Sequence, residues 1–417
     1  GGWIADNIVG QRRAVFLGGV LIAVGHGILS LPTQDLFYWG LLVIAPGVGL
    51  LKPNISAMVG QLYRKGDPRR DAGFSIYYIG INVGALMAPV ACGYVGQMIN
   101  WHLGFLIAGI GMTLGLVQFW LGGKFLGTAG VVPGGAPTPE ARAVARKRGF
   151  TGGLITAAVV AAVAALTGSG AVNVSPEDVA NIFGIILVLV TLGFFGWLFG
   201  ANSWTKDERN KLIVVTIFFV AVIFFWSAFE QAGSTLNLFA ERNTRNEVFG
   251  TAFPASWFQS VNALFIILLA PVFAALWMGL GKREPSSPAK FAVGLLLVGA
   301  GFALMLIPAD DAQNGSLVSP WWLVGMYLLH TLGELCVSPV GLSAMTKLAP
   351  ERVTGLIMGV WFLGPAIANY VSGRVAGLYE SMPLTELFGL VTAFAVGSAL
   401  VMAVLVPWAK RLMGEVR

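Results

Sequence analysis

Three isolated charges are the first candidates for chemistry, because each lies inside a long apolar stretch. Lys52, Glu230 and Glu334 all occur in runs long enough to cross a bilayer. A charge at the bilayer centre costs about 2.5–3.5 kcal/mol on insertion scales, so such residues usually face a water-filled cavity and mark a substrate or ion path. The three charges therefore predict a transporter.

Lys52 and Glu334 carry opposite charges and could bind the two ends of a zwitterion. An ammonium group has three donors and no acceptor, so Lys52 in an apolar helix needs a carboxylate or carbonyl partner. Glu334 lies four residues before Ser338 and shares a helix face with it. Two structural interpretations stay open: Lys52 could pair with a helix carboxylate, and Glu334 could be hydrogen-bonded between helices.

Glu230 is the candidate proton carrier. A carboxyl group in a low-dielectric cavity can bind and release a proton in response to solvent access or a nearby cation. Glu230 could instead be a permanent salt-bridge partner that holds two helix bundles together. The two interpretations are compatible if the bridge opens on protonation.

Amide and aromatic side chains could complete a binding site for an organic molecule. Asn82 and Asn262 each offer donors and acceptors in one side chain, although a buried Asn often only joins helices in membranes. Trp226, one turn before Glu230, and Trp361 with its neighbour Phe362 could line side-chain pockets. Core packing or anchoring at the membrane interface is an equal alternative for these aromatic residues.

The composition predicts a polytopic membrane protein. Of the 417 residues, 56% are hydrophobic and only 11% are charged, and the mean hydropathy is +0.77; soluble proteins carry about 25% charged residues. The net charge of +6 could suggest a nucleic-acid partner, but the basic residues come in short clusters between apolar runs, as the positive-inside rule predicts. We expect no nucleic-acid partner.

The sequence lacks the patterns of a metal centre or an enzyme. Cys92 and Cys336 lie in apolar segments and have neither disulfide nor metal-ligand spacing. The three histidines are scattered singly, and neither H-E-x-x-H nor G-x-S-x-G occurs. We therefore expect no enzyme activity, no metal and no cofactor.

Apolar runs of about 20 residues predict twelve membrane helices. Their approximate ranges are 12–30, 37–61, 72–97, 102–122, 150–171, 178–200, 212–234, 253–280, 289–308, 320–347, 352–378 and 385–409. The even count puts both ends of the chain on one side. All but four of the 26 Lys and Arg residues lie on that side or at its helix ends, so the positive-inside rule makes it cytoplasmic.

The chain opens with a loop that matches a superfamily signature. Gly2, Asp6, Gly10, Arg12 and Arg13 fit the pattern G-x-x-x-D-x-x-G-x-R-R, which resembles the loop between the second and third helices of the major facilitator superfamily. The resemblance implies that two helices precede this sequence. We expect Asp6 to pair with Arg12 or Arg13 at the cytoplasmic face; an ordinary charged loop is the alternative.

Six further motifs resemble, in order, those of the proton-dependent oligopeptide transporters. They are Gly49-Leu-Leu-Lys52-Pro53-Asn54, the run Phe74–Gly84 with Tyr78 and Asn82, Phe225-Trp226-x-x-x-Glu230-Gln231, Ser256–Asn262, Gly333-Glu334-x-x-x-Ser338-Pro339 and Gly359-x-Trp361-Phe362-Leu363. The resemblance covers essentially the whole chain. It implies a major facilitator fold of two helical bundles plus an inserted helix pair.

The resemblance also implies a division of the chain. Residues 1–122 are the rest of the N-terminal bundle, its third to sixth helices; residues 123–149 are a cytoplasmic linker; residues 150–200 are the inserted pair; and residues 201–417 are the C-terminal six-helix bundle. The family's proton-coupling E-x-x-E-R-F motif belongs on its first helix and does not occur in this sequence.

By the same resemblance, the function is proton-coupled symport of di- and tripeptides across the cytoplasmic membrane by alternating access. Lys52 would bind the peptide C-terminus and Glu334 its N-terminus, Glu230 would couple protons, and Asn82, Asn262, Trp226, Trp361, Tyr78 and Ser338 would complete the peptide site. We expect peptides, protons and the lipid bilayer as partners, and a monomer.

One alternative substrate class stays open. A relative that moves nitrate or another anion could also use Lys52, because an ammonium binds any anion. Glu334 argues against this, since a carboxylate near the site repels anions. A channel would not explain opposite charges in two bundles.

Overall fold

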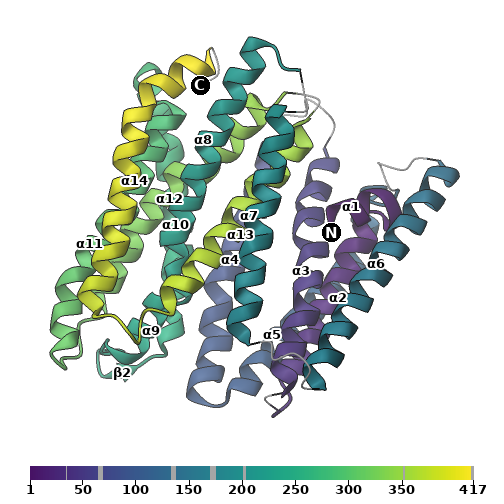
Figure 1. Ribbon diagram of the computed structural model, residues 1–417. Helices are drawn as coiled ribbons and strands as arrows, with labels where there is room; N and C mark the ends of the chain where they lie inside the picture. Colours follow the sequence, from purple (N-terminus) through teal and green to yellow (C-terminus); the bar gives the residue numbers. More distant parts are fainter. Residues whose placement is uncertain are drawn as a thin grey trace. The chain divides into compact units, whose positions relative to one another are not determined.

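The computed structural model describes residues 1–33, 35–63, 69–132, 138–169, 175–200, 203–350 and 353–414. The chain divides into two compact units, Gly1–Val174 and Ser175–Arg417. Helices make up nearly all of both units (Figure 1). The predicted all-α class is confirmed, and each unit is described by itself below.

The described part of the first unit contains five long helices, α2 to α6, and three short helical turns. Its elements are α1 (Gly2–Ile4), η1 (Ala5–Val9), α2 (Gln11–Leu29), α3 (Asp35–Gln61), α4 (Arg69–Met98), α5 (Trp101–Leu121), η2 (Gly122–Leu126) and α6 (Pro139–Gly168). Val15, Ile22 and Leu29 recur every seventh residue on α2 and are buried, which gives this helix one apolar stripe. α2 packs along α3 and α5, and α4 packs against α5.

The second unit is a larger helical bundle with a short hairpin. Its elements are α7 (Pro176–Gly200), α8 (Lys206–Phe229), η3 (Glu230–Gly233), α9 (Thr235–Arg242), β1 (Glu247–Val248), β2 (Thr251–Ala252), η4 (Ala255–Trp257), α10 (Phe258–Leu280), η5 (Gly281–Arg283), α11 (Ser287–Gln313), α12 (Trp321–Leu348), α13 (Thr354–Ala376) and α14 (Leu384–Met413). Strand β1 pairs antiparallel with β2. Phe218 of α8 and Phe291 of α11 are fully buried and stack with ring centroids 4.6 Å apart.

Eleven helical segments of the described chain are long and apolar enough to cross a membrane. They correspond to eleven of the twelve predicted spans. The predicted span 150–171 lies largely within α6, which is not among the eleven. The chain is therefore a multi-pass membrane protein.

The predicted linker 123–149 is partly helical. Residues Gly122–Leu126 form a 3₁₀ turn, and α6 begins at Pro139. Thr138 accepts a hydrogen bond from the backbone N–H of Ala141 through its hydroxyl oxygen (3.2 Å), and proline is favoured at the first position of a helix. The basic cluster 142–148 consequently lies on a helix, whereas the glycine and proline run suggested an irregular segment.

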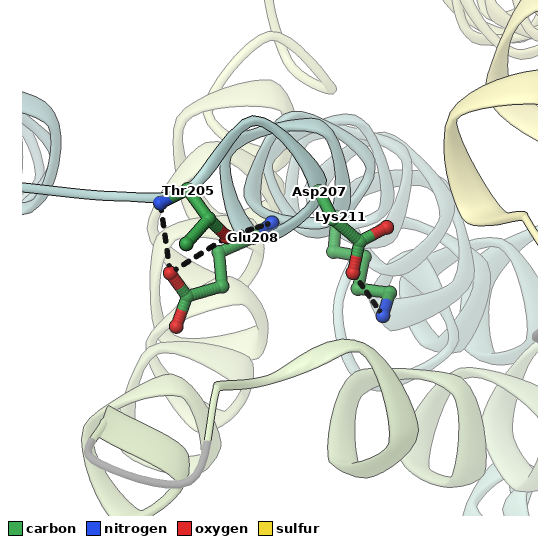
Figure 2. Close-up of polar contacts among 4 residues, drawn as sticks. All are labelled: Thr205, Asp207, Glu208 and Lys211. Carbon is green, nitrogen blue, oxygen red and sulfur yellow. Dashed lines mark hydrogen bonds and ion pairs between the residues drawn. The ribbon is translucent and has the colours of Figure 1, made fainter.

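Helix α8 begins six residues before the predicted start at 212, because its first turn is capped. The Thr205 hydroxyl accepts from the Glu208 N–H at 3.2 Å, and the Glu208 carboxylate accepts from the Thr205 N–H at 2.9 Å (Figure 2). This reciprocal capping box satisfies two backbone donors at the helix start. Lys211 pairs with Asp207 one turn apart at 2.6 Å (Figure 2) and supports the same turn.

The prediction of one continuous helix over 212–234 is wrong at its far end. Helix α8 ends at Phe229, residues Glu230–Gly233 form a 3₁₀ segment, and α9 resumes at Thr235. Ser234 between them has φ −128° and ψ −95°, outside the helical region. The predicted proton carrier Glu230 therefore lies at a break in a membrane span.

Candidate functional site

The predicted site residues are divided between the two units. The first unit holds Lys52, Tyr78 and Asn82 and the loop residues Asp6, Arg12 and Arg13; the second holds Trp226, Glu230, Asn262, Glu334, Ser338 and Trp361.

Lys52 lies well inside α3, next to the helix-internal Pro53. Its side chain is exposed within the first unit, and no described residue of that unit forms an ion pair with it. Asn54 is buried two residues later, and its Nδ2 donates to the Leu50 carbonyl at 2.7 Å. The charged group of Lys52 is thus available on the surface of the first unit.

Asn82 is buried on α4, with only 6% of its surface exposed. Its Nδ2 donates to the carbonyl oxygen of Tyr78 at 2.9 Å, one turn earlier on the same helix. Tyr78 itself is exposed. The hydrogen bond of Asn82 therefore stays within α4 and does not join two helices.

The opening loop is fixed by Arg12, although not through Asp6. The Arg12 guanidinium donates to the carbonyl oxygens of Gly123 (2.5 Å) in η2 and of Gly127 (3.2 Å) directly after it. Asp6 instead accepts from Gln11 Nε2 at 3.2 Å. The expected ion pair of Asp6 with Arg12 or Arg13 is not formed among the residues that the structure describes. The reason is the chain direction: Gly10 turns at φ 81°, a conformation that favours glycine, and Arg12 is directed toward η2.

Glu334 has a hydrogen-bond partner on a neighbouring helix. It is buried on α12, and its Oε2 accepts a hydrogen bond from Asn262 Nδ2 of α10 at 3.1 Å. The same Nδ2 lies 3.0 Å from the hydroxyl of Thr331, which in turn donates to the Tyr327 carbonyl at 2.7 Å. Two residues from separate sequence motifs therefore form one polar cluster between α10 and α12. This is the bond that the structural interpretation of Glu334 requires, and it also places an amide beside the carboxyl group.

Glu230 is half-buried at the end of α8. Its charge and that of Glu334 interact electrostatically, which places the two carboxyl groups in one neighbourhood of the second unit. The Trp226 ring lies edge-on to Phe225 and to Phe229, with centroids 5.5 Å and 4.9 Å away. The ionisable groups of this unit are thus bordered by an aromatic cluster.

Trp361 packs into the core of the second unit. It is only 6% exposed, whereas its neighbour Phe362 is 58% exposed. A Cβ atom added to Gly341 of α12 would lie 2.1 Å from Cη2 of the Trp361 ring and 2.8 Å from Cζ of Phe291. The ring therefore fills the space that the missing side chain of Gly341 leaves. Ser338, one turn earlier on α12, has a buried hydroxyl with no hydrogen-bond partner in the described part of the chain.

Substituting Gly341 by alanine should destabilise the second unit. The new methyl group would overlap the Trp361 ring, and overpacking of this kind costs about 1–3 kcal/mol. We expect a lower melting temperature in detergent, measured by intrinsic fluorescence. The matched control is Gly359→Ala on α13, where an added Cβ meets no atom within 4 Å. Equal melting temperatures for both variants and the parent would contradict the predicted overlap.

Sequence reasoning missed the functional potential of His330 and Gln231. His330 is fully buried on α12, between the rings of Phe229 and Phe302, with centroid distances of 5.8 Å and 5.1 Å. Its position four residues before Glu334 was a usable signal, since such residues share a helix face. Gln231 is fully buried next to Glu230. It belongs to the Phe225–Gln231 motif, from which the sequence predicted a role for Glu230 but none for this amide. Among the described residues, no three His, Cys, Asp or Glu side chains could hold a metal ion.

A second polar cluster ties α9 to the segment between α13 and α14. Arg242 of α9 pairs with Glu380, and the Tyr379 hydroxyl donates to Asn243 Oδ1 at 2.7 Å. Burial raises the pKa of the Tyr379 phenol to about 12, so this hydroxyl remains a neutral donor at physiological pH. The end of α9 is therefore anchored independently of the break at Glu230.

The comparisons with known proteins agree over nearly the whole chain. A family profile described as the POT family matches residues 12–393. The peptide transporter YePEPT of Yersinia enterocolitica is 41% identical over 421 residues, which cover 97% of this chain and 81% of the relative. The di-/tripeptide transporter of Lactococcus lactis is 37% identical over 428 residues, which cover 100% of this chain and 84% of the relative. A crystal structure of the peptide transporter POT in complex with sulfate superposes with a TM-score of 0.92 at 40% identity, covering 99% of this chain and 83% of that one.

Proposed function

Because this chain belongs to the POT family, we propose that it is a proton-coupled symporter of di- and tripeptides. The similar proteins from Yersinia enterocolitica and Lactococcus lactis are named as peptide and di-/tripeptide transporters. The structural observation that carries the proposal is the buried carboxyl group of Glu334, hydrogen-bonded to Asn262. A buried carboxyl group suits a cationic amino group and repels an anion, so it favours a zwitterionic substrate.

We propose that the two ends of the peptide are bound by opposite charges. Lys52 of α3 supplies an ammonium group with three donors for the peptide carboxylate. Glu334 of α12 supplies acceptors for the peptide amino group. Charge pairs of this kind also reject substrates that lack one end, because the charge that faces the missing end would be left unpaired.

The remaining candidates would serve the middle of the peptide. Asn82 and Asn262 can each donate to and accept from a main-chain amide. Tyr78 and Ser338 add hydroxyl groups, and the Ser338 hydroxyl has no other partner in the described chain. Trp226 and Trp361 are proposed to shape side-chain pockets, Trp361 from its position in the core.

Glu230 is proposed to carry the coupled proton. Its position at a helix break, in electrostatic contact with Glu334, lets a change in its charge act on the residue proposed to hold the peptide amine. A salt bridge that opens when Glu230 is protonated is compatible with this role.

The transport cycle is proposed to be alternating access in the cytoplasmic membrane. Residues 1–122 and 201–417 would be the two bundles, residues 123–149 the cytoplasmic linker and residues 150–200 an inserted pair. Asp6, Arg12 and Arg13 would form a conformational loop, which Arg12 ties to η2. Both ends of the chain would be cytoplasmic, the transporter would act as a monomer, and no cofactor besides the proton gradient would be needed.

The test is uptake of a labelled dipeptide into liposomes. The protein is reconstituted, and an inward proton gradient is imposed or omitted. We expect accumulation that depends on the gradient and is competed by unlabelled di- and tripeptides. Folded protein that takes up no peptide but does take up labelled nitrate would overturn the proposal in favour of an anion carrier.

A further inference from the structure

The break in the span Lys206–Arg242 is organised around one buried amide. Gln231 is 0% exposed, although it lies in the 3₁₀ segment directly after Glu230. Its Nε2 donates to the carbonyl oxygen of Ser227 at 3.2 Å, and its Oε1 accepts from the hydroxyls of Thr235 (2.5 Å) and Ser234 (3.4 Å). Gln231 therefore bonds to the last turn of α8 on one side and to the start of α9 on the other.

These bonds lie where the regular hydrogen-bond pattern of α8 changes to that of the 3₁₀ segment. In a continuous helix, backbone N–H groups would satisfy the carbonyl oxygens of the last turn of α8. Inside a membrane span an unsatisfied backbone group is costly, because no water is available to pair with it. The Gln231 amide supplies the donor for Ser227 and accepts the hydroxyl of Thr235, which is also fully buried. The turn that carries Glu230 is thus bonded on both sides by this one side chain.

The same amide connects the break to α13. Gln231 Nε2 lies 3.5 Å from the carbonyl oxygen of Ser372, and the hydroxyls of Ser234 and Ser372 are 3.4 Å apart. Ser372 is buried, and α13 packs along α8. A rearrangement of the Glu230 turn would therefore alter the contacts of α13, the helix that carries Trp361.

We propose that Gln231 is a positioning residue, which holds Glu230 in place for proton exchange and transmits the state of its turn to α13. The inference rests on the proposed role of Glu230 as the proton carrier. Gln231 itself binds neither peptide nor proton. It acts by fixing the two helix ends between which the carboxyl group is presented.

Several other ionisable groups on the elements around the break contact residues of the second unit. On α12, Glu334 interacts electrostatically with Glu230, and His330 packs against the Phe229 ring. On α13, Arg374 lies 3.9 Å from Glu177 of α7. On α9, Arg242 pairs with Glu380, and on α11, Lys290 pairs with Glu284. A shift in the pH profile of a Gln231 variant would therefore be attributed to Glu230, Glu334 or His330.

The test compares Gln231→Met and Thr235→Val with Gln313→Met. Methionine has a similar shape to glutamine without its hydrogen bonds, and valine removes the Thr235 hydroxyl. Gln313 is the matched control, because its Oε1 joins α11 to α14 through Thr385 at 2.6 Å and 3.0 Å. The readouts are gradient-driven accumulation between pH 5 and 8, the KM and maximal rate, and gradient-free exchange of internal for external dipeptide.

We expect Gln231→Met to lower the maximal rate of gradient-driven uptake about tenfold, as befits loss of a buried polar partner, and to move the pH midpoint. The rate of dipeptide exchange and the KM should stay within about twofold of the parent values, because the contacts to the substrate are unchanged. Thr235→Val should act in the same direction, more weakly, and Gln313→Met should match the parent. An unchanged pH midpoint in both Gln231→Met and Thr235→Val, or proportional losses of exchange and driven uptake, would overturn the inference.

A parallel Glu230→Gln measurement separates this inference from the function on which it rests. If Glu230→Gln still accumulates peptide with the gradient, the proton role of Glu230 fails, and the role of Gln231 fails with it. If Glu230→Gln abolishes accumulation while Gln231→Met and Thr235→Val behave as the parent, only the positioning role is wrong. Should Gln231→Met fail to fold, Thr235→Val alone decides the outcome.

Discussion

Liposomes that contain the Glu230→Gln variant should take up dipeptide only until the inside and outside concentrations are equal. Glutamine keeps the size and hydrogen-bonding capacity of the side chain but has no proton to exchange. The imposed gradient should therefore no longer drive accumulation. Exchange of labelled for unlabelled dipeptide across the membrane should persist, because it needs no net proton movement. The measurement is the time course of labelled dipeptide with and without the gradient.

The matched control for this experiment is Glu241→Gln. Glu241 lies on α9 of the same unit and is exposed, so its loss should leave driven uptake unchanged. If the Glu230→Gln protein lost exchange and accumulation together and also melted at a lower temperature, Glu230 would instead be a structural salt-bridge partner. Concentrative uptake at the parental level would refute a proton role for this residue.

Affinity for unmodified dipeptides should fall about thirtyfold or more in the Glu334→Gln variant, because loss of one partner of a buried charge pair costs on the order of 2–5 kcal/mol. Glutamine retains an oxygen that can accept from Asn262, so the link between α10 and α12 is expected to survive. An N-acetylated dipeptide has no ammonium group and should bind the parent and the variant equally weakly. Binding is measured by competition against a labelled dipeptide.

The acetylated peptide distinguishes recognition from structure. If Glu334 only joins helices, both peptides should lose affinity to the same extent, and the melting temperature should fall. Glu386→Gln, an exposed carboxylate in the first turn of α14, serves as the control and should leave both affinities unchanged. An undiminished affinity of Glu334→Gln for the free dipeptide would remove Glu334 from the proposed site.

The helical architecture was predictable because membrane helices are encoded locally. A run of about 20 apolar residues is sufficient evidence for a span, and eleven such spans are found among the described residues. The errors arose where local chemistry competes with hydropathy. The capping box at Thr205 extends α8 into a charged segment. The break after Phe229 lies inside a stretch predicted as one helix, where buried side chains such as Gln231 supply hydrogen bonds that hydropathy does not report.

The identities of the candidate site residues could be read from the sequence, but their partners could not. Glu334 and Asn262 were both candidates, yet their hydrogen bond joins positions 72 residues apart, and no periodicity reports such a contact. The same limit explains the loop: Arg12 was expected to pair with the nearby Asp6, whereas it bonds to carbonyl oxygens more than a hundred residues away. Long-range hydrogen bonds depend on how helices pack, which a single sequence does not specify.

The hydrogen bond between Asn262 and Glu334 has a consequence for the return of the unloaded carrier. The bond occupies only Oε2, at 3.1 Å, and a carboxylate accepts at both of its oxygens, so a peptide amine can bind Oε1 while the Asn262 amide stays in place. When the peptide leaves, the buried carboxyl group still has one donor. This retained donor lowers the penalty on unloading. A substrate that must be released in every cycle benefits from such a permanent partner, because tight capture would slow turnover as surely as weak capture.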